Sequence, residues 1–132
     1  MFLVDTSVWI GYLRGAQTEA VRKLEEIQSR DYPFGITSLI CQEILQGADS
    51  EMSFTRFQRY LQTQIFYHPT DPVGTYLEAA RIYARCRWAG ITIRSTVDCL
   101  IAQIAIEHGL LLLHDDRDFD HMARVVPDLQ IH

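Results

Sequence analysis

The chain contains almost no lysine. Lys23 is the single lysine among twelve basic residues, and the other eleven are arginines. Phosphoryl-transfer sites usually place a lysine beside the phosphoryl group, and Lys23 lies in the middle of an early amphipathic stretch. The sequence also has no glycine-rich loop of the kind that cradles phosphates. These two absences argue against a phosphatase or a phospho-receiver.

Cysteine is scarce as well. Cys41, Cys86 and Cys99 are odd in number and lack the close spacing of zinc ligands, which disfavours both a zinc site and a disulfide scaffold. No apolar run approaches the roughly 20 residues of a membrane helix. The start, Met1 to Val4, has neither the basic region nor the long apolar run of a signal peptide. We therefore expect a cytoplasmic protein with no membrane partner.

The charge and size are those of a single globular domain. The 132 residues are 48% hydrophobic and 22% charged, with a formal net charge of −5. We expect one domain over residues 1–132 with a proper hydrophobic core. A negative chain does not adhere broadly to nucleic acid. It can still be a nucleic-acid enzyme, because metal ions bound to its acids would cancel part of the charge.

Short apolar runs alternate with longer amphipathic stretches along the chain. This pattern predicts an α/β fold, in which helices cover both faces of a parallel sheet. Sites in such sheets lie outside the carboxyl ends of the strands. Thr6 or Ser7 can cap the first helix, after Asp5. The expected strands are Phe2–Val4, Pro33–Ile36, Ile65–Tyr67, Leu110–Leu113 and Leu129–Ile131.

Four acids stand where strands end or buried helices begin: Asp5, Glu43, Asp98 and Asp116. Each has an ordinary structural explanation. Asp5 is a suitable helix cap, Glu43 could be solvated, Asp98 is spaced from Ser95 as in a capping box, and Asp116 belongs to an acidic loop. Together they would repel one another unless a hard divalent cation binds, and Mg²⁺ or Mn²⁺ suits such oxygen ligands best.

Four motifs, in this order and spacing, resemble the PIN-domain ribonucleases and, among them, the VapC-type toxins. The resemblance covers essentially the whole chain and implies an α/β/α sandwich with a five-stranded parallel sheet. It also implies Mg²⁺- or Mn²⁺-dependent cleavage of RNA, a cognate antitoxin protein that blocks the site, and a homodimer. The motifs are Leu3–Ile10, Ile36–Ser38 with Gln42–Gly47, Val97–Ala102 and Leu113–Phe119.

By position in these motifs, the resemblance implies that Asp5, Glu43, Asp98 and Asp116 are catalytic. Asp5, Asp98 and Asp116 are then the metal ligands, and the supporting residues are Thr6, Ser7 and Asp118. Asp116 and Asp118 both fit the family's acidic pattern, and Asp116 is preferred. The family often has Thr or Ser where His114 stands.

Two other functions remain open. The chain could be a catalytically inert PIN-like module that binds RNA or protein. It could also be a phosphatase or phospho-receiver with Asp5 as the nucleophile, which the scarcity of lysine disfavours.

Four arginines form the nearest approach to a basic patch. They are Arg81, Arg85, Arg87 and Arg94. The early helices carry many aromatic and apolar residues, from Trp9 to Leu61, that either pack inward or meet an antitoxin.

Overall fold

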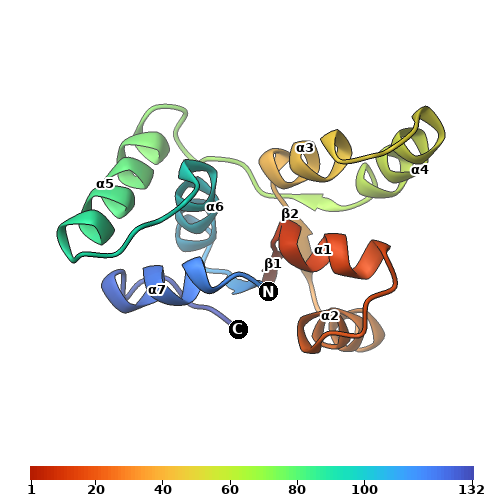
Figure 1. The fold of residues 1–132 in the computed structure, drawn as a ribbon, viewed down its shortest axis with the longest axis horizontal. Coiled ribbons are helices and arrows are strands. Elements are labelled where there is room, and N and C mark those ends of the chain that lie inside the picture. Colours follow the sequence, from red (N-terminus) through yellow and green to blue (C-terminus); the bar gives the residue numbers. More distant parts are fainter.

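The computed structural model describes residues 1–132, folded into four strands and seven helices (Figure 1). All strand pairs are parallel, in the order β3-β2-β1-β4. The strands are β1 (Phe2–Val4), β2 (Phe34–Ile36), β3 (Ile65–Phe66) and β4 (Leu111–Leu113). The helices are α1 (Thr6–Leu13), α2 (Glu19–Ser29), α3 (Ser38–Gln46), α4 (Glu51–Leu61), α5 (Gly74–Trp88), α6 (Thr96–Glu107) and α7 (Arg117–Val125).

The predicted α/β fold with a parallel sheet is confirmed, but the prediction of five strands is wrong. The expected last strand is reduced to one parallel bridge, between Ile131 and Leu112 of β4. A turn after α7, in which the amide of Leu129 donates to the carbonyl of Val126, occupies the backbone just before this point. Only the carbonyl of Gln130 and the amide of His132 then reach β4.

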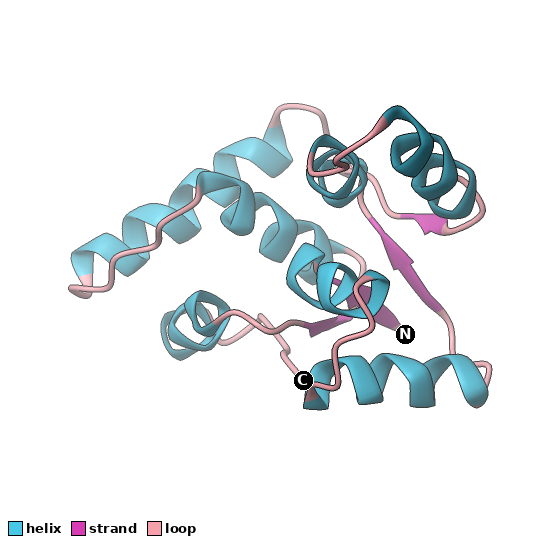
Figure 2. Cartoon of the chain, turned by 45° about the vertical axis from the view of Figure 1, so that its right-hand side comes forward, coloured by secondary structure: helices cyan, strands magenta, loops and turns pink.

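The helices form two groups around the sheet. Helix α5 packs against α6 and α7, whereas α1 contacts α2 and α3, and α3 contacts α4. Figure 1 shows α5, α6 and α7 together on the left and α1 to α4 on the right, with β1 between them. Figure 2 shows α5 and α6 running side by side. No helix combines the length and apolar character that a membrane span requires.

The sheet places β1 and β4 at the centre of the core. Leu3, Val4 and Leu112 are fully buried, and the apolar helix α6 is buried from Cys99 to Ala105 except at Gln103. β1 pairs with β2 on one side and with β4, far along the chain, on the other. The chain therefore reverses its strand order between β1 and β4, where sheets of this class place their sites.

The helix starts differ from the predictions in two informative ways. Asp5, not Thr6 or Ser7, is the N-cap of α1, and its side chain accepts from the amide of Ser7. Ser95 is the N-cap residue of α6, as expected, but no side-chain hydrogen bond forms there. The capping-box explanation for Asp98 is therefore wrong, and that carboxylate is left to other contacts.

Candidate active site

The acids predicted from the sequence come from four separate elements. Asp5 follows β1, Glu43 lies on α3, Asp98 lies in the first turn of α6, and Asp116 ends the loop between β4 and α7. Each element ends or begins at the carboxyl edge of the sheet, because the parallel strands all point the same way. The charges of Asp5, Glu43 and Asp116 each help to raise the pKa of Asp98, so the four acids lie close enough to interact.

Asp5 is held firmly by one oxygen only. Its Oδ2 accepts hydrogen bonds from the amide of Ser7 at 3.0 Å and from the Ser7 hydroxyl at 2.7 Å. Capping therefore uses one oxygen, and Oδ1 is buried without any hydrogen-bond partner. Burial raises the pKa of Asp5 despite the bonds from Ser7. A buried carboxylate oxygen without a donor is costly unless a cation or proton reaches it.

Ser7 and Thr6 tie the cluster to neighbouring elements. The Ser7 hydroxyl, which donates to Asp5, also accepts from the amide of Asp115 at 2.9 Å, so it links the ends of β1 and β4. The Thr6 hydroxyl donates to Oε1 of Glu43 at 2.7 Å. Burial raises the pKa of Glu43, the Thr6 bond opposes this, and the charge of Asp5 adds to it. The two hydroxyls thus fix both carboxylates.

Asp98 is the acid most strongly affected by its surroundings. Its pKa is raised from 3.8 to about 7, first by burial and then by the charges of Asp5, Asp116, Glu43 and Asp118. A carboxylate with this many acidic neighbours is unfavourable in its charged form unless positive charge is supplied. Asp98 is therefore the electrostatic centre of the cluster.

Asp116 and Asp118 complete the cluster beside Asp98. Oxygens of these three carboxylates lie within 4.8 Å of one another. Asp116 caps α7, because its Oδ1 accepts from the amide of Asp118 at 3.0 Å. Burial raises the pKa of Asp118, but hydrogen bonds and charge from Arg94 outweigh it, and the net pKa lies below the ordinary value. The structure thus places Asp118, which was predicted as a supporting acid, in the same close group as Asp98 and Asp116. Asp5, which was predicted as a metal ligand, is not part of this group.

The donor set fits a hard divalent cation. It offers several carboxylates and one buried oxygen without a partner, and it includes no thiolate or imidazole from the residues in that close group. Mg²⁺ and Mn²⁺ take such oxygen ligands readily. Repulsion among the acids and the unpartnered Oδ1 of Asp5 would both be relieved by one or more such ions.

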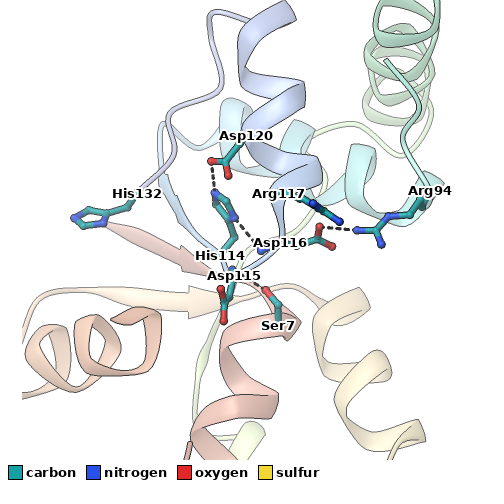
Figure 3. A pocket seen from close by; sticks show the side chains of 8 residues that line it. All are labelled: Ser7, Arg94, His114, Asp115, Asp116, Arg117, Asp120 and His132. Carbon is teal, nitrogen blue, oxygen red and sulfur yellow. Dashed lines mark hydrogen bonds and ion pairs between the residues drawn. The ribbon is translucent and has the colours of Figure 1, made fainter. Parts of the chain in front are cut away.

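A polar hollow of about 720 Å³ opens beside the cluster (Figure 3). No hydrophobic residue lines it. Figure 3 shows Arg94 and Arg117 on the side of Asp116, with His114 between Asp116 and Asp120. The hollow is lined by Ser7, Arg94, His114, Asp115, Asp116, Arg117, Asp120 and His132. It could accept the phosphates of a polar substrate.

Sequence reasoning missed the roles of Arg94 and His114. The sequence suggests one basic patch of Arg94 with the arginines of α5, but Arg94 lies in the loop before α6 and contacts Asp116 and Asp118. Its position four residues before Asp98 was the only available signal. His114 is buried and accepts, at Nδ1, from the amide of Asp116 at 3.2 Å. Arg81 instead pairs with Glu78 on the helix surface.

Comparison with known proteins agrees with this architecture. The profile of the family described as PIN domain matches residues 2–125. "VapC ribonuclease Mb1587" of Mycobacterium bovis is 38% identical over 129 residues, which cover 95% of this chain and 93% of the relative. "Ribonuclease VapC11" of Mycobacterium tuberculosis matches with the same identity and coverage.

Solved structures share the fold at low sequence identity. The VapBC2 structure from Rickettsia felis, bound to a fragment of promoter DNA, has a TM-score of 0.74 at 14% identity and covers 99% of this chain and 96% of its own. The VapBC-1 structure from Haemophilus influenzae has a TM-score of 0.73 at 16% identity, with the same coverage. With the acids of β1, α3, α6 and the β4–α7 loop gathered at one sheet edge, the chain belongs to the PIN-domain family, among its VapC-type members.

Proposed function

We propose that this chain is a metal-dependent endoribonuclease and the toxin of a toxin–antitoxin pair. One observation carries the proposal: Asp98, with its pKa raised to about 7, faces a cluster of acids in which Oδ1 of Asp5 has no partner. Such a site is unfavourable as an isolated structural feature and becomes favourable when it binds divalent cations. The 38% identical relatives carry the name ribonuclease.

Asp5, Asp98 and Asp116 are the proposed metal ligands. A divalent ion bound there would activate water and stabilise the charge that develops on a phosphodiester. Asp5 offers its free Oδ1 to that site, while Ser7 fixes its other oxygen. Glu43, held by Thr6 at 2.7 Å, is placed to orient the attacking water or accept its proton. Asp118 supports the cluster through Arg94.

The polar hollow is the proposed path of the RNA. Arg94 and Arg117 line it together with Asp116. Arginine forks bind phosphate oxygens in pairs, and they would offset the repulsion between RNA and a chain of net charge −5. The alternative of a catalytically inert binding module does not explain why several carboxylates lie crowded together at this site.

An antitoxin is the proposed protein partner, since the neighbouring VapBC structures are named for such pairs. A small pocket of about 80 Å³ lies between α1, α3 and α4. Its lining includes Ile10, Leu13 and Phe57, and also Glu43 of the acidic cluster. An apolar antitoxin side chain seated there would lie beside Glu43, and its neighbours in the antitoxin could direct a basic side chain at the acids. A homodimer is proposed from the family alone.

The early helices show which aromatic residues remain for such a partner. Trp9 and Leu61 are fully buried in the core, so they are not available. Phe54 and Tyr60 of α4 are exposed, as is Ile10 of α1. The surface of α1 and α4 therefore keeps apolar groups that the core does not use.

The decisive experiment is cleavage of RNA by the purified chain with Mg²⁺ or Mn²⁺, and with a chelator. Wild type should cut RNA only with the ion, and Asp98→Asn should not cut. Asp49→Asn is the matched control, because Asp49 is an exposed acid in the loop between α3 and α4. Cleavage by Asp98→Asn at the wild-type rate, or equal cleavage in chelator, would contradict the proposal.

A further inference from the structure

Arg94 is the one arginine or lysine in direct contact with the acidic cluster. It extends from the loop between α5 and α6, and Figure 3 shows its guanidinium meeting Asp116 at the rim of the polar hollow. Nη2 of Arg94 lies 2.9 Å from Oδ1 of Asp116, and Nε lies 3.0 Å from Oδ2 of Asp118. One side chain thus neutralises two of the three carboxylates that come within 4.8 Å of one another.

The two contacts of Arg94 differ in strength. Asp118 is almost fully buried and receives both Nε and the backbone amide of Arg94, at 3.0 and 3.2 Å. Asp116 is more exposed and receives only the terminal Nη2 from Arg94. The Arg94 side chain is itself 64% exposed, so its outer end moves with little loss of packing. The contact with Asp116 is therefore the one that can open while Asp118 stays paired.

We propose that Arg94 is a resident cation of the acidic cluster, which holds Oδ1 of Asp116 and competes with a metal ion for that carboxylate. This inference rests on the proposed function, since it takes Asp116 as a metal ligand. Arg94 is then a positioning residue that keeps Asp118 out of the metal site and competes with the ion for Asp116. The freed end of the guanidinium would lie in the hollow, where a phosphate of the RNA could take the place of Asp116.

The competition has a measurable size. Arg94 shares Oδ1 of Asp116 with the backbone amide of Asp118, so it competes chiefly through its positive charge beside the proposed ion. For a guanidinium about 6 Å from the ion and screened as strongly as in bulk water, removal of this charge should tighten binding of a divalent ion by about tenfold. The metal affinity should therefore rise when Arg94 is removed. If Arg94 were needed only to keep the site folded, its removal would lower the affinity instead.

The test is Mn²⁺ binding to the full chain, measured by calorimetry and by the electron paramagnetic resonance signal of free Mn²⁺. We expect Arg94→Met to bind Mn²⁺ about tenfold more tightly than wild type. Arg94→Lys should fall between them, because a compact ammonium cannot bridge two carboxylates. The matched control is Arg117→Met, which removes the same charge from the same hollow but makes no ion pair with an acid. Its affinity should stay within about threefold of wild type.

Arg94→Met leaves the buried Asp118 without its cation and could impair folding. The pair Asp118→Asn and Arg94→Met/Asp118→Asn removes this difficulty, since neither variant has the buried charge. The double variant should bind Mn²⁺ more tightly than Asp118→Asn, because only Asp116 is then released. Equal affinities in this pair would overturn the proposal, as would an equal gain in Arg117→Met.

The proposal and the function beneath it fail in different ways. If neither wild type nor any Arg94 variant binds Mn²⁺ at millimolar concentration, the metal-dependent function is wrong and this inference falls with it. If wild type binds Mn²⁺ and Arg94→Met binds it equally or more weakly, the metal site stands and the role of Arg94 as a competitor is refuted.

Discussion

Without metal ions, the charge on Asp98 should destabilise the folded chain. The pKa of this group is raised from 3.8 to about 7, so the folded state holds the Asp98 proton more tightly than the unfolded state. Stability from this group is therefore fully present below about pH 4 and is lost as the pH rises toward 7 and above. A pKa raised from 3.8 to about 7 corresponds to about 4 kcal/mol at most.

The measured effect should be smaller than this limit. Asp98 is only partly buried, so solvent screens its repulsion from the other acids, and we expect about 2 kcal/mol. Asp98→Asn removes the charge with little change in shape. At pH 8 in chelator, its melting temperature should exceed that of wild type by roughly 6–10 °C. At pH 4.5 the difference should largely disappear.

Thermal unfolding by circular dichroism or calorimetry at both pH values tests this reasoning. Asp49→Asn, an exposed acid in a loop, serves as the control and should melt like wild type at each pH. Added Mn²⁺ should reverse the order, because the ion stabilises wild type by about 2.7 kcal/mol at one hundred times its Kd and binds Asp98→Asn weakly. An Asp98→Asn variant no more stable than wild type at pH 8, or equally stabilised at both pH values, would refute the electrostatic argument.

Three further predictions concern the site and its partners. Asp116→Asn should lower the rate of RNA cleavage by about a hundredfold, which is a larger loss than for Asp118→Asn, and Asp115→Asn should have the smallest effect. The test is the cleavage rate at limiting and at saturating Mg²⁺. A larger loss in Asp118→Asn would exchange the roles of Asp116 and Asp118. Thr6→Val should lower the rate by about tenfold, because Glu43 loses the donor that fixes it, and Thr6→Ser should restore most activity. Co-expression with the product of an adjacent small reading frame should yield a stable, inactive complex, and light scattering of the free chain should show a dimer. A monomer that binds no such product above micromolar concentration would count against the proposal that the chain is a toxin.

Much of the architecture could be predicted from the order of residues. Alternating apolar and amphipathic stretches indicated a parallel α/β fold, and the strands appear where Phe2–Val4 and Leu110–Leu113 predicted them, within one residue. Strong local signals explain this success, because short apolar runs and helix-capping residues can be recognised in the sequence before their distant partners are known. The fifth strand failed, since the turn from Val126 to Leu129 competes for the same backbone groups.

The sequence by itself determined which acids were available and that they stood at strand ends and helix starts. Only the tertiary structure decided how they are used. It assigned one oxygen of Asp5 to capping and left the other free, kept Asp98 out of the capping box, and set Arg94 on Asp116 and Asp118. These outcomes depend on distances between residues far apart in the chain, and burial and repulsion act through space rather than along the sequence.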